Sequence, residues 1–205
     1  MTGERLPRPA RRAQIVAAAA TAFLSRGYDG TSMEDVATAA GVTRLVVYRI
    51  FETKHELYQA VLASATDDLA AEFRDTDIFA VRERGGIVPL MLIVARRHPD
   101  AFRLLWRHAD HEPEFAVFSQ RFRAVLADFA EAVIDVSATG APIHGPVMRH
   151  WCATVLVEHL LGGVCAWLDV GDPCHDESFV VALTCGLLAL IEAWSEPRPP
   201  PWLTS

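Results

Sequence analysis

The stretch from residue 31 to residue 58 constrains the fold of this chain more than any other, because helix starts, helix stops and apolar residues alternate in it over short distances. Two Thr-x-x-Glu sequences, at 31–34 and 53–56, have the spacing of a capping box, in which each side chain satisfies a free amide at a helix start. Gly41 can adopt the left-handed conformation that ends a helix, and Thr43 can cap the next helix. Apolar residues recur at helical spacing on both sides of this glycine: Met33, Val36, Ala37, Ala40, Val46, Val47, Ile50 and Phe51. The pattern predicts two short helices joined by a tight turn, followed by the start of a third.

Helical periodicity continues through almost the whole sequence, and neither a strand–helix alternation nor a hairpin signal interrupts it. We therefore expect an all-α fold of about nine helices, with boundaries placed to within about three residues. The expected helices span residues 9–26, 32–40, 44–51, 54–73, 79–98, 99–109, 113–137, 147–168 and 176–195. The expected domains are 1–53, which holds the helix-turn-helix, 54–196, a larger helical domain, and 197–205, an extended proline-rich tail.

A helix-turn-helix places its second helix in the major groove of DNA, so residues 1–53 are predicted to form a DNA-binding domain. The segment also resembles the DNA-binding signature of the tetracycline-repressor (TetR) family. The resemblance covers about the first quarter of the chain and rests on the sequences at 31–37, 40–43, 47–51 and 53–57. The chain departs from the usual family pattern at Leu45, Val46, Arg49 and Ile50. The resemblance implies a ligand-responsive transcriptional regulator, and favours a repressor released from a palindromic operator by a hydrophobic small molecule.

Several side chains of the two short helices are predicted to contact DNA. Arg44 is the expected base reader, because its guanidinium fork matches the acceptor pair that guanine presents in the major groove. Ser32 is expected to offer its amide and hydroxyl to a phosphate. Tyr48 lies four residues after Arg44 on the same helix face, and the resemblance implies that it contacts backbone or base. The full predicted set is Ser32, Thr43, Arg44, Leu45, Tyr48, Arg49 and Lys54. The alternative for each is an ordinary solvated side chain or, for the aromatic, core packing.

The net charge of the chain, −7, is unusual for a DNA-binding protein until its two ends are considered separately. Residues 1–60 hold eight Lys and Arg against six Asp and Glu, a net charge of +2. Residues 61–205 hold eleven against twenty, a net charge of −9. The positive charge is therefore concentrated in the part that carries the helix-turn-helix, as expected if only that part meets phosphates.

The last two expected helices, 147–168 and 176–195, are apolar around most of their circumference, which requires burial on more than one side. Small residues interrupt both helices and allow close approach: Gly162, Gly163, Ala166, Ala182, Gly186 and Ala189. The resemblance implies that these helices pair with their copies in a second subunit as a four-helix bundle. A homodimer also fits DNA binding, because a dimer reads two half-sites related by its own two-fold axis. Burial of both helices within one subunit is the alternative.

The segment 102–129 is rich in aromatic residues, with Arg and His side chains between them. The resemblance implies an effector pocket inside the larger helical domain, and such pockets are mostly apolar with a few placed polar groups. The predicted lining is Phe102, Trp106, Phe118, Phe122, Trp151, Val155 and His159. The alternative for each aromatic is plain core packing, and for His159 a hydrogen-bonded core histidine.

Two other functions are the alternatives to a ligand-responsive regulator. An architectural DNA-binding protein without a ligand would lack sequence preference and show only the steep salt dependence of phosphate contacts. A small helical enzyme would use His108 and His111 with an acidic residue, but the sequence shows no nucleophile elbow, glycine-rich phosphate loop or His/carboxylate cluster of recognised spacing. The same histidines fall short of the three or four protein ligands of a zinc site. We therefore expect no catalysis, no metal and no cofactor.

The cysteines and apolar runs indicate a cytoplasmic protein. Cys152, Cys165, Cys174 and Cys185 form no Cys-x-x-Cys pair, so we expect buried structural thiols. The apolar run at 179–191 falls short of the roughly 20 residues that a membrane-spanning helix needs, and we expect it to be a buried helix. The N-terminal residues do not have the pattern of a signal peptide.

Overall fold

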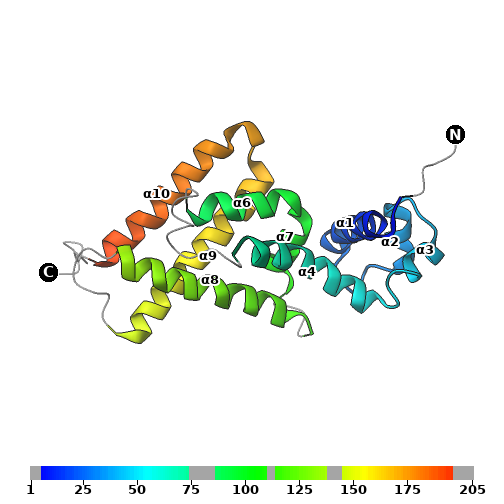
Figure 1. Ribbon diagram of the computed structural model, residues 1–205, viewed down its shortest axis with the longest axis horizontal. Coiled ribbons are helices and arrows are strands. Elements are labelled where there is room, and N and C mark those ends of the chain that lie inside the picture. Colours follow the sequence, from blue (N-terminus) through cyan, green and yellow to red (C-terminus); the bar gives the residue numbers. More distant parts are fainter. Residues whose placement is uncertain (1–5, 74–85, 110–113, 138–144, 196–205) are drawn as a thin grey trace. The chain divides into compact units, whose positions relative to one another are not determined.

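The structure is a computed structural model that describes residues 6–73, 86–109, 114–137 and 145–195 (Figure 1). Over those ranges it contains nine α-helices, one short 3-10 helix and no strand, which confirms the expected all-α fold. The chain divides into two compact units, formed by the described parts of Met1–Ala71 with Val94–Ser119 and of Glu72–Ile93 with Gln120–Ser205. The expected limits at residues 53 and 196 are a functional division and stay a prediction, and the tail at 197–205 lies outside the described residues.

The first unit begins with four helices that share one apolar core. They are α1 (Arg8–Arg26), α2 (Met33–Ala39), α3 (Arg44–Tyr48) and α4 (Lys54–Phe73). Each of the four helices contributes buried side chains to this core: Ile15 and Phe23 from α1, Val36 from α2, Val47 from α3, and Leu57 and Tyr58 from α4. The third helix is shorter than the expected 44–51, because its regular hydrogen bonding ends at Tyr48.

The turn between α2 and α3 forms as the glycine predicts. Gly41 has φ of 64°, in the left-handed region that costs other residues free energy. Its amide donates to the carbonyl of Thr38 at 3.1 Å, and the amide of Val42 donates to the carbonyl of Ala37 at 3.0 Å. These two hydrogen bonds define a Schellman motif, which satisfies the last carbonyls of α2 and reverses the chain toward α3.

The predicted capping box at 31–34 is wrong by one residue. Ser32 caps α2: its hydroxyl accepts from the amide of Asp35 at 3.1 Å, and the Asp35 carboxylate accepts from the Ser32 amide at 2.9 Å. Thr31 is buried, and its hydroxyl is within hydrogen-bond distance of the carbonyls of Ala22 and Gly27. The capping role moves to Ser32 because the Thr31 hydroxyl joins the end of α1 to the start of α2.

The other two expected caps form only in part. The Thr53 hydroxyl accepts from the amide of Glu56 at 3.0 Å, so this threonine does cap α4. The Glu56 carboxylate, however, accepts from the amide of Glu52 rather than from that of Thr53. Thr43 occupies the N-cap position of α3, but its side chain makes no cap hydrogen bond.

A later part of the chain completes the first unit. Helix α7 (Pro99–Arg107) packs against α1, and Thr21 Oγ1 donates to Asp100 Oδ2 at 2.6 Å where the two meet. Phe115, just before α8, is fully buried and packs edge-on to Tyr58, with ring centroids 4.4 Å apart. These contacts explain why the compact unit extends beyond the helix-turn-helix itself.

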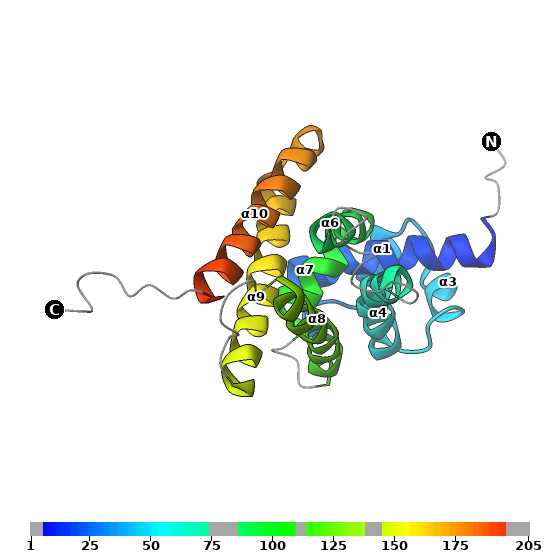
Figure 2. The ribbon, with the colours of Figure 1, turned by 60° about the vertical axis from the view of Figure 1, so that its left-hand side comes forward.

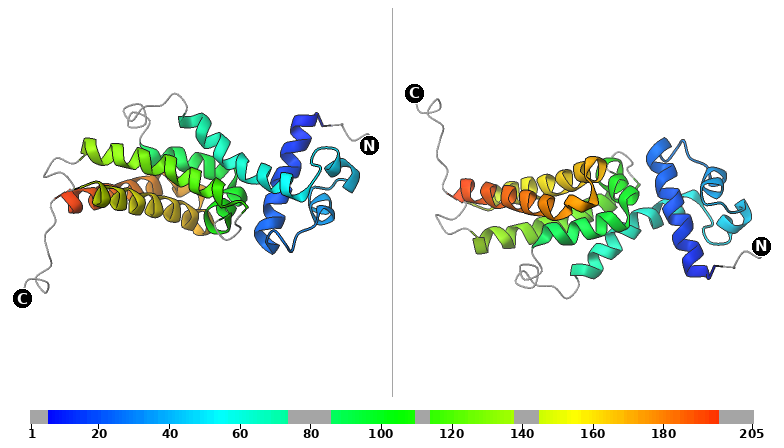
Figure 3. Two further views of the ribbon diagram at one scale, coloured as in Figure 1. Left: turned by 90° about the horizontal axis from the view of Figure 1, so that it is seen from below. Right: turned by 90° about the horizontal axis from the view of Figure 1, so that it is seen from above.

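The second unit holds most of the remaining helices. Its elements are α6 (Ile87–Arg97) and α8 (Ala116–Ser137), each of which shares residues with the first unit, together with α9 (Pro146–Val170), the 3-10 helix η2 (Pro173–His175) and α10 (Asp176–Ser195). Helices α9 and α10 lie side by side (Figures 2 and 3). A Cβ on Gly163 would lie 2.9 Å from Cδ1 of Leu183, so a larger residue there would require the Leu183 side chain to shift. The expected helix starts at 79 and 113 lie outside the described residues.

Helix α9 is also joined to α8 by pairs of opposite charge. Arg149 lies 3.3 Å from Asp135, and Arg123 lies 3.3 Å from Glu158. These partly exposed pairs contribute little free energy each.

Two helices, α9 and the one that contains the apolar run at 179–191, are longer than that run. Pro146–Val170 and Pro173–Ser195 are both long and apolar enough to cross a membrane by length and composition alone. Core helices of soluble proteins pass the same test, and half of the most apolar window of α9 is buried inside the structure. Only 22% of the corresponding window of α10 is buried, so much of that helix leaves an apolar surface uncovered.

The cysteines do not all behave as expected. Cys152 and Cys165 are buried, whereas Cys174 and Cys185 are exposed. The prediction of buried structural thiols is therefore wrong for the last two, because they lie in the turn after α9 and on the uncovered side of α10.

Candidate DNA-binding surface

Helix α3 has one buried and one exposed face. Val47 is completely buried and anchors the helix in the core of the first unit. Leu45 and Tyr48, on the other side, have exposed fractions of 63% and 39%, and Arg44 is exposed beside them. An apolar and an aromatic side chain exposed next to an arginine are suited to base edges, since a thymine methyl and the guanine acceptors lie in the same groove.

Arg44 is held in place by its neighbours. Its guanidinium donates to the Tyr48 hydroxyl at 3.4 Å and lies 5.2 Å from the centre of the Tyr48 ring. A second guanidinium nitrogen lies 3.6 Å from a carboxylate oxygen of Glu34 in α2. The hydrogen bond with Tyr48, followed by the charge of Tyr48 and that of Glu34, raises the pKa of Arg44. The side chain is thus a fixed, permanently charged donor on the exposed face of α3.

Ser32 and Asp35 form a closed arrangement at the start of α2. The Ser32 amide, expected to bind a phosphate, already donates to the Asp35 carboxylate. Asp35 is also 2.7 Å from Arg26. The Ser32 hydrogen bonds, more than the charge of Arg26, lower the pKa of Asp35. A phosphate at this helix start would therefore have to compete with a side-chain carboxylate.

Lys54 is engaged within the protein. Its Nζ donates to the carbonyl of Tyr28 at 2.8 Å and lies 4.3 Å from the centre of the Tyr28 ring. These contacts tie the start of α4 to the turn that follows α1, so Lys54 has a structural role that the sequence did not predict. Thr43 and Arg49 are exposed, and their contact with DNA stays a prediction.

Gln14 is a residue that sequence reasoning missed. Its side-chain amide donates to the carbonyl of Ala40 at 2.9 Å, and its carbonyl accepts from Arg11 at 2.9 Å. It therefore joins α1 to the turn that sets the angle of α3. The available signal was a polar residue directly before the buried pair Ile15 and Val16.

The predicted pocket residues are distributed over both compact units. Phe102 is buried, and Trp106 and Phe118 are partly exposed, all in the first unit. The second unit holds Phe122, Trp151, Val155 and His159. The pocket that these seven residues were expected to line stays a prediction.

The polar and aromatic members of this set in α9 lie at the surface. Trp151 is 51% exposed, with its ring centre 5.7 Å from that of Trp194 in α10. His159 is exposed too, and a Cβ on Gly186 would lie 3.6 Å from its Nε2. His159 is therefore not the buried core histidine of the alternative interpretation. His108 is exposed, and His111 lies outside the described residues.

This geometry is that of a helix-turn-helix DNA-binding domain, and comparisons with known proteins relate this part of the chain to one family. The family described as "Bacterial regulatory proteins, tetR family" matches residues 15–61, from α1 into α4. A transcriptional activator, FasR of Mycolicibacterium smegmatis, is 44% identical over 72 residues, which are 35% of this chain and 33% of FasR. The repressor BepR of Brucella suis is 25% identical over 165 residues, 77% of this chain and 78% of BepR. The chain thus spans about a third of the length of the first relative and most of the second.

Solved structures share the fold over almost the whole chain. A TetR-like transcriptional regulator from Rhodococcus sp. RHA1 has a TM-score of 0.72 at 20% identity, covering 95% of this chain and 100% of that one. AibR, solved in complex with isovaleryl coenzyme A and operator DNA, has a TM-score of 0.62 at 23% identity, covering 87% of this chain and 98% of that one. Residues 15–61 therefore match the DNA-binding region of the tetR family, and the rest of the chain shares the fold of TetR-like regulators.

Proposed function

We propose that the protein is a homodimeric transcriptional repressor that binds a palindromic operator and releases it when a hydrophobic small molecule binds. The observation that carries the DNA-binding part is the exposed face of α3, on which Arg44 is fixed beside Tyr48 and Leu45. Repression is chosen over activation because BepR, the relative that aligns over most of this chain, is named a repressor. The named relatives are regulators, which favours a binding protein over an enzyme.

An uncovered stripe on α10 supports the dimer. Five residues at helical spacing on one side of this helix are exposed, and none is charged: Val181, Ala182, Cys185, Leu188 and Ala189. Val181 and Leu188 have exposed fractions of 58% and 50%. A surface that is both apolar and lined by small residues favours a second copy of the same helix, since two helices can approach closely there. The dimer would place two copies of α3 on one operator.

The ligand-responsive part follows from thermodynamic linkage. A small molecule can release the operator only if it binds one arrangement of the dimer more tightly than the DNA-bound one. The relative AibR, whose structure contains isovaleryl coenzyme A and operator DNA, is an example of a neighbour with both ligands. For this chain we propose an apolar effector bound by residues of the predicted pocket set, in a protein that acts on DNA in the cytoplasm.

Capture and sequencing of fragmented source DNA tests the DNA-binding part. The purified full-length protein is compared with Arg44→Ala/Tyr48→Ala and with Arg121→Ala, which removes an exposed arginine of α8. We expect the wild-type protein and Arg121→Ala to enrich one palindromic site, and the double variant to enrich none. Equal enrichment by all three would remove α3 as the reading element. Enrichment without sequence preference, with only a steep salt dependence, would favour an architectural protein.

The effector part is tested on the captured site. Candidate apolar compounds, chosen from the chemistry of the genes next to that site, are added to the protein–operator complex. Release of the operator by one compound class, together with a rise in the temperature of unfolding of the free protein, is the expected result. A compound that stabilises the protein but leaves operator affinity unchanged would contradict release, because it would have equal affinity for both states.

A further inference from the structure

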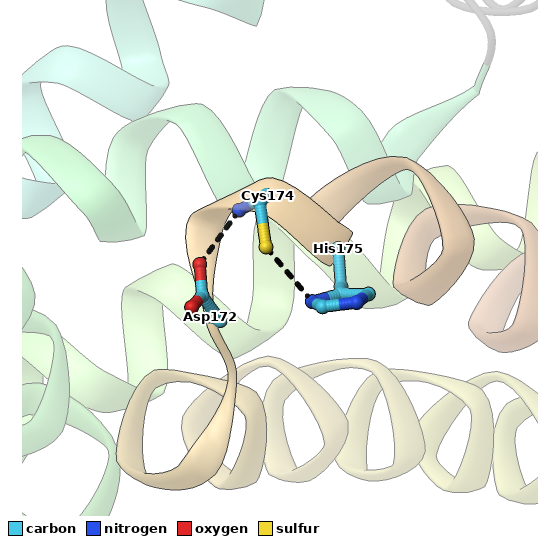
Figure 4. A group of neighbouring side chains, drawn as sticks. All are labelled: Asp172, Cys174 and His175. Carbon is cyan, nitrogen blue, oxygen red and sulfur yellow. Dashed lines mark hydrogen bonds between the residues drawn. The ribbon is translucent and has the colours of Figure 1, made fainter.

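The turn between α9 and α10 gathers three different metal-ligating side chains (Figure 4). Asp172, Cys174 and His175 each offer one ligand atom, and these atoms all lie within 4.8 Å of one another. The Cys174 sulfur lies 3.0 Å from Nδ1 of His175. All three residues are exposed, so an ion can reach them from solvent. This turn belongs to the second unit and shares no residue with the α3 surface.

Backbone hydrogen bonds hold the three residues in this arrangement. The Asp172 carboxylate accepts from the amide of Cys174 at 2.9 Å, and the amide of His175 donates to the Asp172 carbonyl at 2.9 Å. Asp172 is thereby the N-cap of the short helix η2. Side chains three positions apart in a 3-10 turn lie on the same side, so the turn itself brings Asp172 and His175 together without any contribution from distant parts of the chain.

The turn is also anchored at both of its ends by Trp167. The indole N–H of Trp167 donates to Asp176 at 2.7 Å, and its ring stacks on that of Phe179 with centroids 4.8 Å apart and planes 5° from parallel. The carbonyl of Trp167 accepts from the amide of Gly171, and a Cβ on Gly171 would clash with the indole ring. Trp167, in the last turn of α9, thus contacts the residues on either side of the cluster through its backbone carbonyl and its indole ring.

We propose that Asp172, Cys174 and His175 form a binding site for one borderline-soft divalent metal ion, represented by Zn²⁺, with solvent completing the coordination. Thiolate, imidazole and carboxylate are the ligands that zinc uses, and three protein ligands leave a fourth position open to water, unlike the four protein ligands of a structural site. The thiolate excludes Mg²⁺ and Ca²⁺ as preferred occupants, since both favour oxygen ligands. The cluster was not predicted from the sequence, which has no Cys-x-x-Cys pair.

Binding requires a small rearrangement and the loss of a proton. Sulfur and nitrogen ligands on one tetrahedral zinc ion lie about 3.5 Å apart, from bond lengths of about 2.3 and 2.0 Å. The Cys174–His175 separation of 3.0 Å must therefore widen slightly, while the widest separation of 4.8 Å must close. The metal forms its bond to sulfur as the thiol proton passes to solvent, so charge and atoms balance.

Cobalt titration of the reduced, metal-free full-length protein tests this site. Co²⁺ bound by a thiolate in tetrahedral geometry shows a near-ultraviolet charge-transfer band together with visible d–d bands. We expect both in the wild-type protein, and their loss when one equivalent of Zn²⁺ is added. A matched pair of variants removes one exposed histidine each: His175→Ala from the cluster, and His150→Ala from α9, where it faces Glu131. Only His175→Ala should weaken binding, by at least the roughly 10- to 100-fold that loss of an outer-shell partner costs.

The variant Cys174→Ser separates this site from the other exposed cysteine. Cys185 remains in that variant, so a thiolate band that persists there would belong to Cys185 and would overturn the proposal. An absence of both bands in the wild-type protein would overturn it as well. A second readout is the temperature of unfolding, which Zn²⁺ should raise for the wild-type protein and His150→Ala but not for Cys174→Ser. These outcomes do not depend on operator binding, so this site and the proposed repressor function can fail separately.

Discussion

The exposed faces of α3 and α10 both carry apolar side chains, but their surroundings differ. On α3, Leu45 and Tyr48 lie beside the charged Arg44, on a helix of five residues that is held by the turns around it. On α10, Val181 and Leu188 lie among alanines and a cysteine, on a helix of 20 residues. A surface that mixes charge and apolar groups fits a polar, charged partner such as DNA. A continuous apolar surface with small side chains fits a copy of itself.

The exposed faces of α3 and α10 are both small, and in the proposed function DNA binding by α3 depends on dimerisation through α10. A five-residue helix can contact only a few base pairs, whereas specific DNA affinity usually comes from a dimer reading two half-sites. A stable protein–protein interface buries about 800 Å² on each partner, which a single exposed stripe on α10 would begin to supply together with α9. In the proposed function, dimerisation through the α10 stripe therefore determines how tightly the two α3 helices together bind the operator.

The largest expected effect comes from Leu188→Arg. This change places an arginine in the uncharged stripe of α10, and in a two-fold dimer it would bring like charges together, at a cost of several kcal/mol. We expect a monomer at micromolar concentration by sedimentation velocity, and a loss of operator affinity of more than about 100-fold. Far-ultraviolet circular dichroism should be unchanged, since Leu188 is half exposed.

Val125→Arg is the matched control for this prediction. Val125 is as exposed as Leu188 but lies on α8, where Arg121 and Asp128 are its exposed neighbours. The Val125 variant should remain a dimer with wild-type operator affinity. If both variants remain dimeric, the α10 stripe is not the dimer interface. The claim that the exposed face of α10 binds a second copy of the chain would then be wrong.

The next effect in size is that of Arg44→Ala. Loss of a bidentate contact with guanine costs about 1–3 kcal/mol, so operator affinity should fall by about 5- to 150-fold, and discrimination at one base pair should relax. Tyr48→Phe removes only the hydroxyl that accepts from Arg44, and should cost less. Fluorescence anisotropy on a panel of single-base operator variants checks both. Uniform weakening of Arg44→Ala across the panel would make Arg44 a phosphate contact rather than a base reader.

The two regions differ in how far the sequence predicts them. The helix-turn-helix is specified by local signals, and the structure confirms the turn at Gly41 and the buried position of Val47. Local spacing does not decide which of two adjacent hydroxyls caps a helix. Thr31 and Ser32 both have an acidic residue three positions later, and the choice depends on whether the carbonyl of Ala22 lies near Thr31 in the folded chain.

The C-terminal half is less predictable, because its features depend on how whole helices pack. Periodicity shows that α9 and α10 are apolar, yet it does not show which side of each stays uncovered. His159 and Trp151 are exposed, because α9 buries a different face, and their place in an effector pocket stays a prediction. The cluster at Cys174 arises from the geometry of a three-residue turn, for which no spacing rule was available.

A smaller effect is expected from Ser32→Ala. The change removes the hydroxyl that caps α2, and such losses cost about 1 kcal/mol of stability. The free energy of unfolding from urea denaturation should fall by this amount if the first unit unfolds with the rest. Ser32→Thr is the matched control, because threonine retains the capping hydroxyl. The operator affinity of Ser32→Ala should be only slightly lower than that of Ser32→Thr. A large loss of operator affinity at unchanged stability would instead support the predicted phosphate contact of Ser32.

The smallest effect is a pH dependence confined to α2. The pKa of Asp35 lies below its ordinary value of 3.8, chiefly because the carboxylate accepts hydrogen bonds from Ser32. The native state thus binds the proton less readily than the unfolded chain, so stability from this group is fully present above pH 3.8 and is lost as the pH falls through the lower, native value. Asp35→Asn should therefore be less stable than the wild-type protein at neutral pH, with the difference narrowing in acid. Urea denaturation of both proteins at pH 7 and in acid measures this directly. If the difference in the free energy of unfolding stays constant with pH, the Asn side chain fails to fit the cap for steric reasons. The charge of Asp35 would then play no part in stabilising the start of α2.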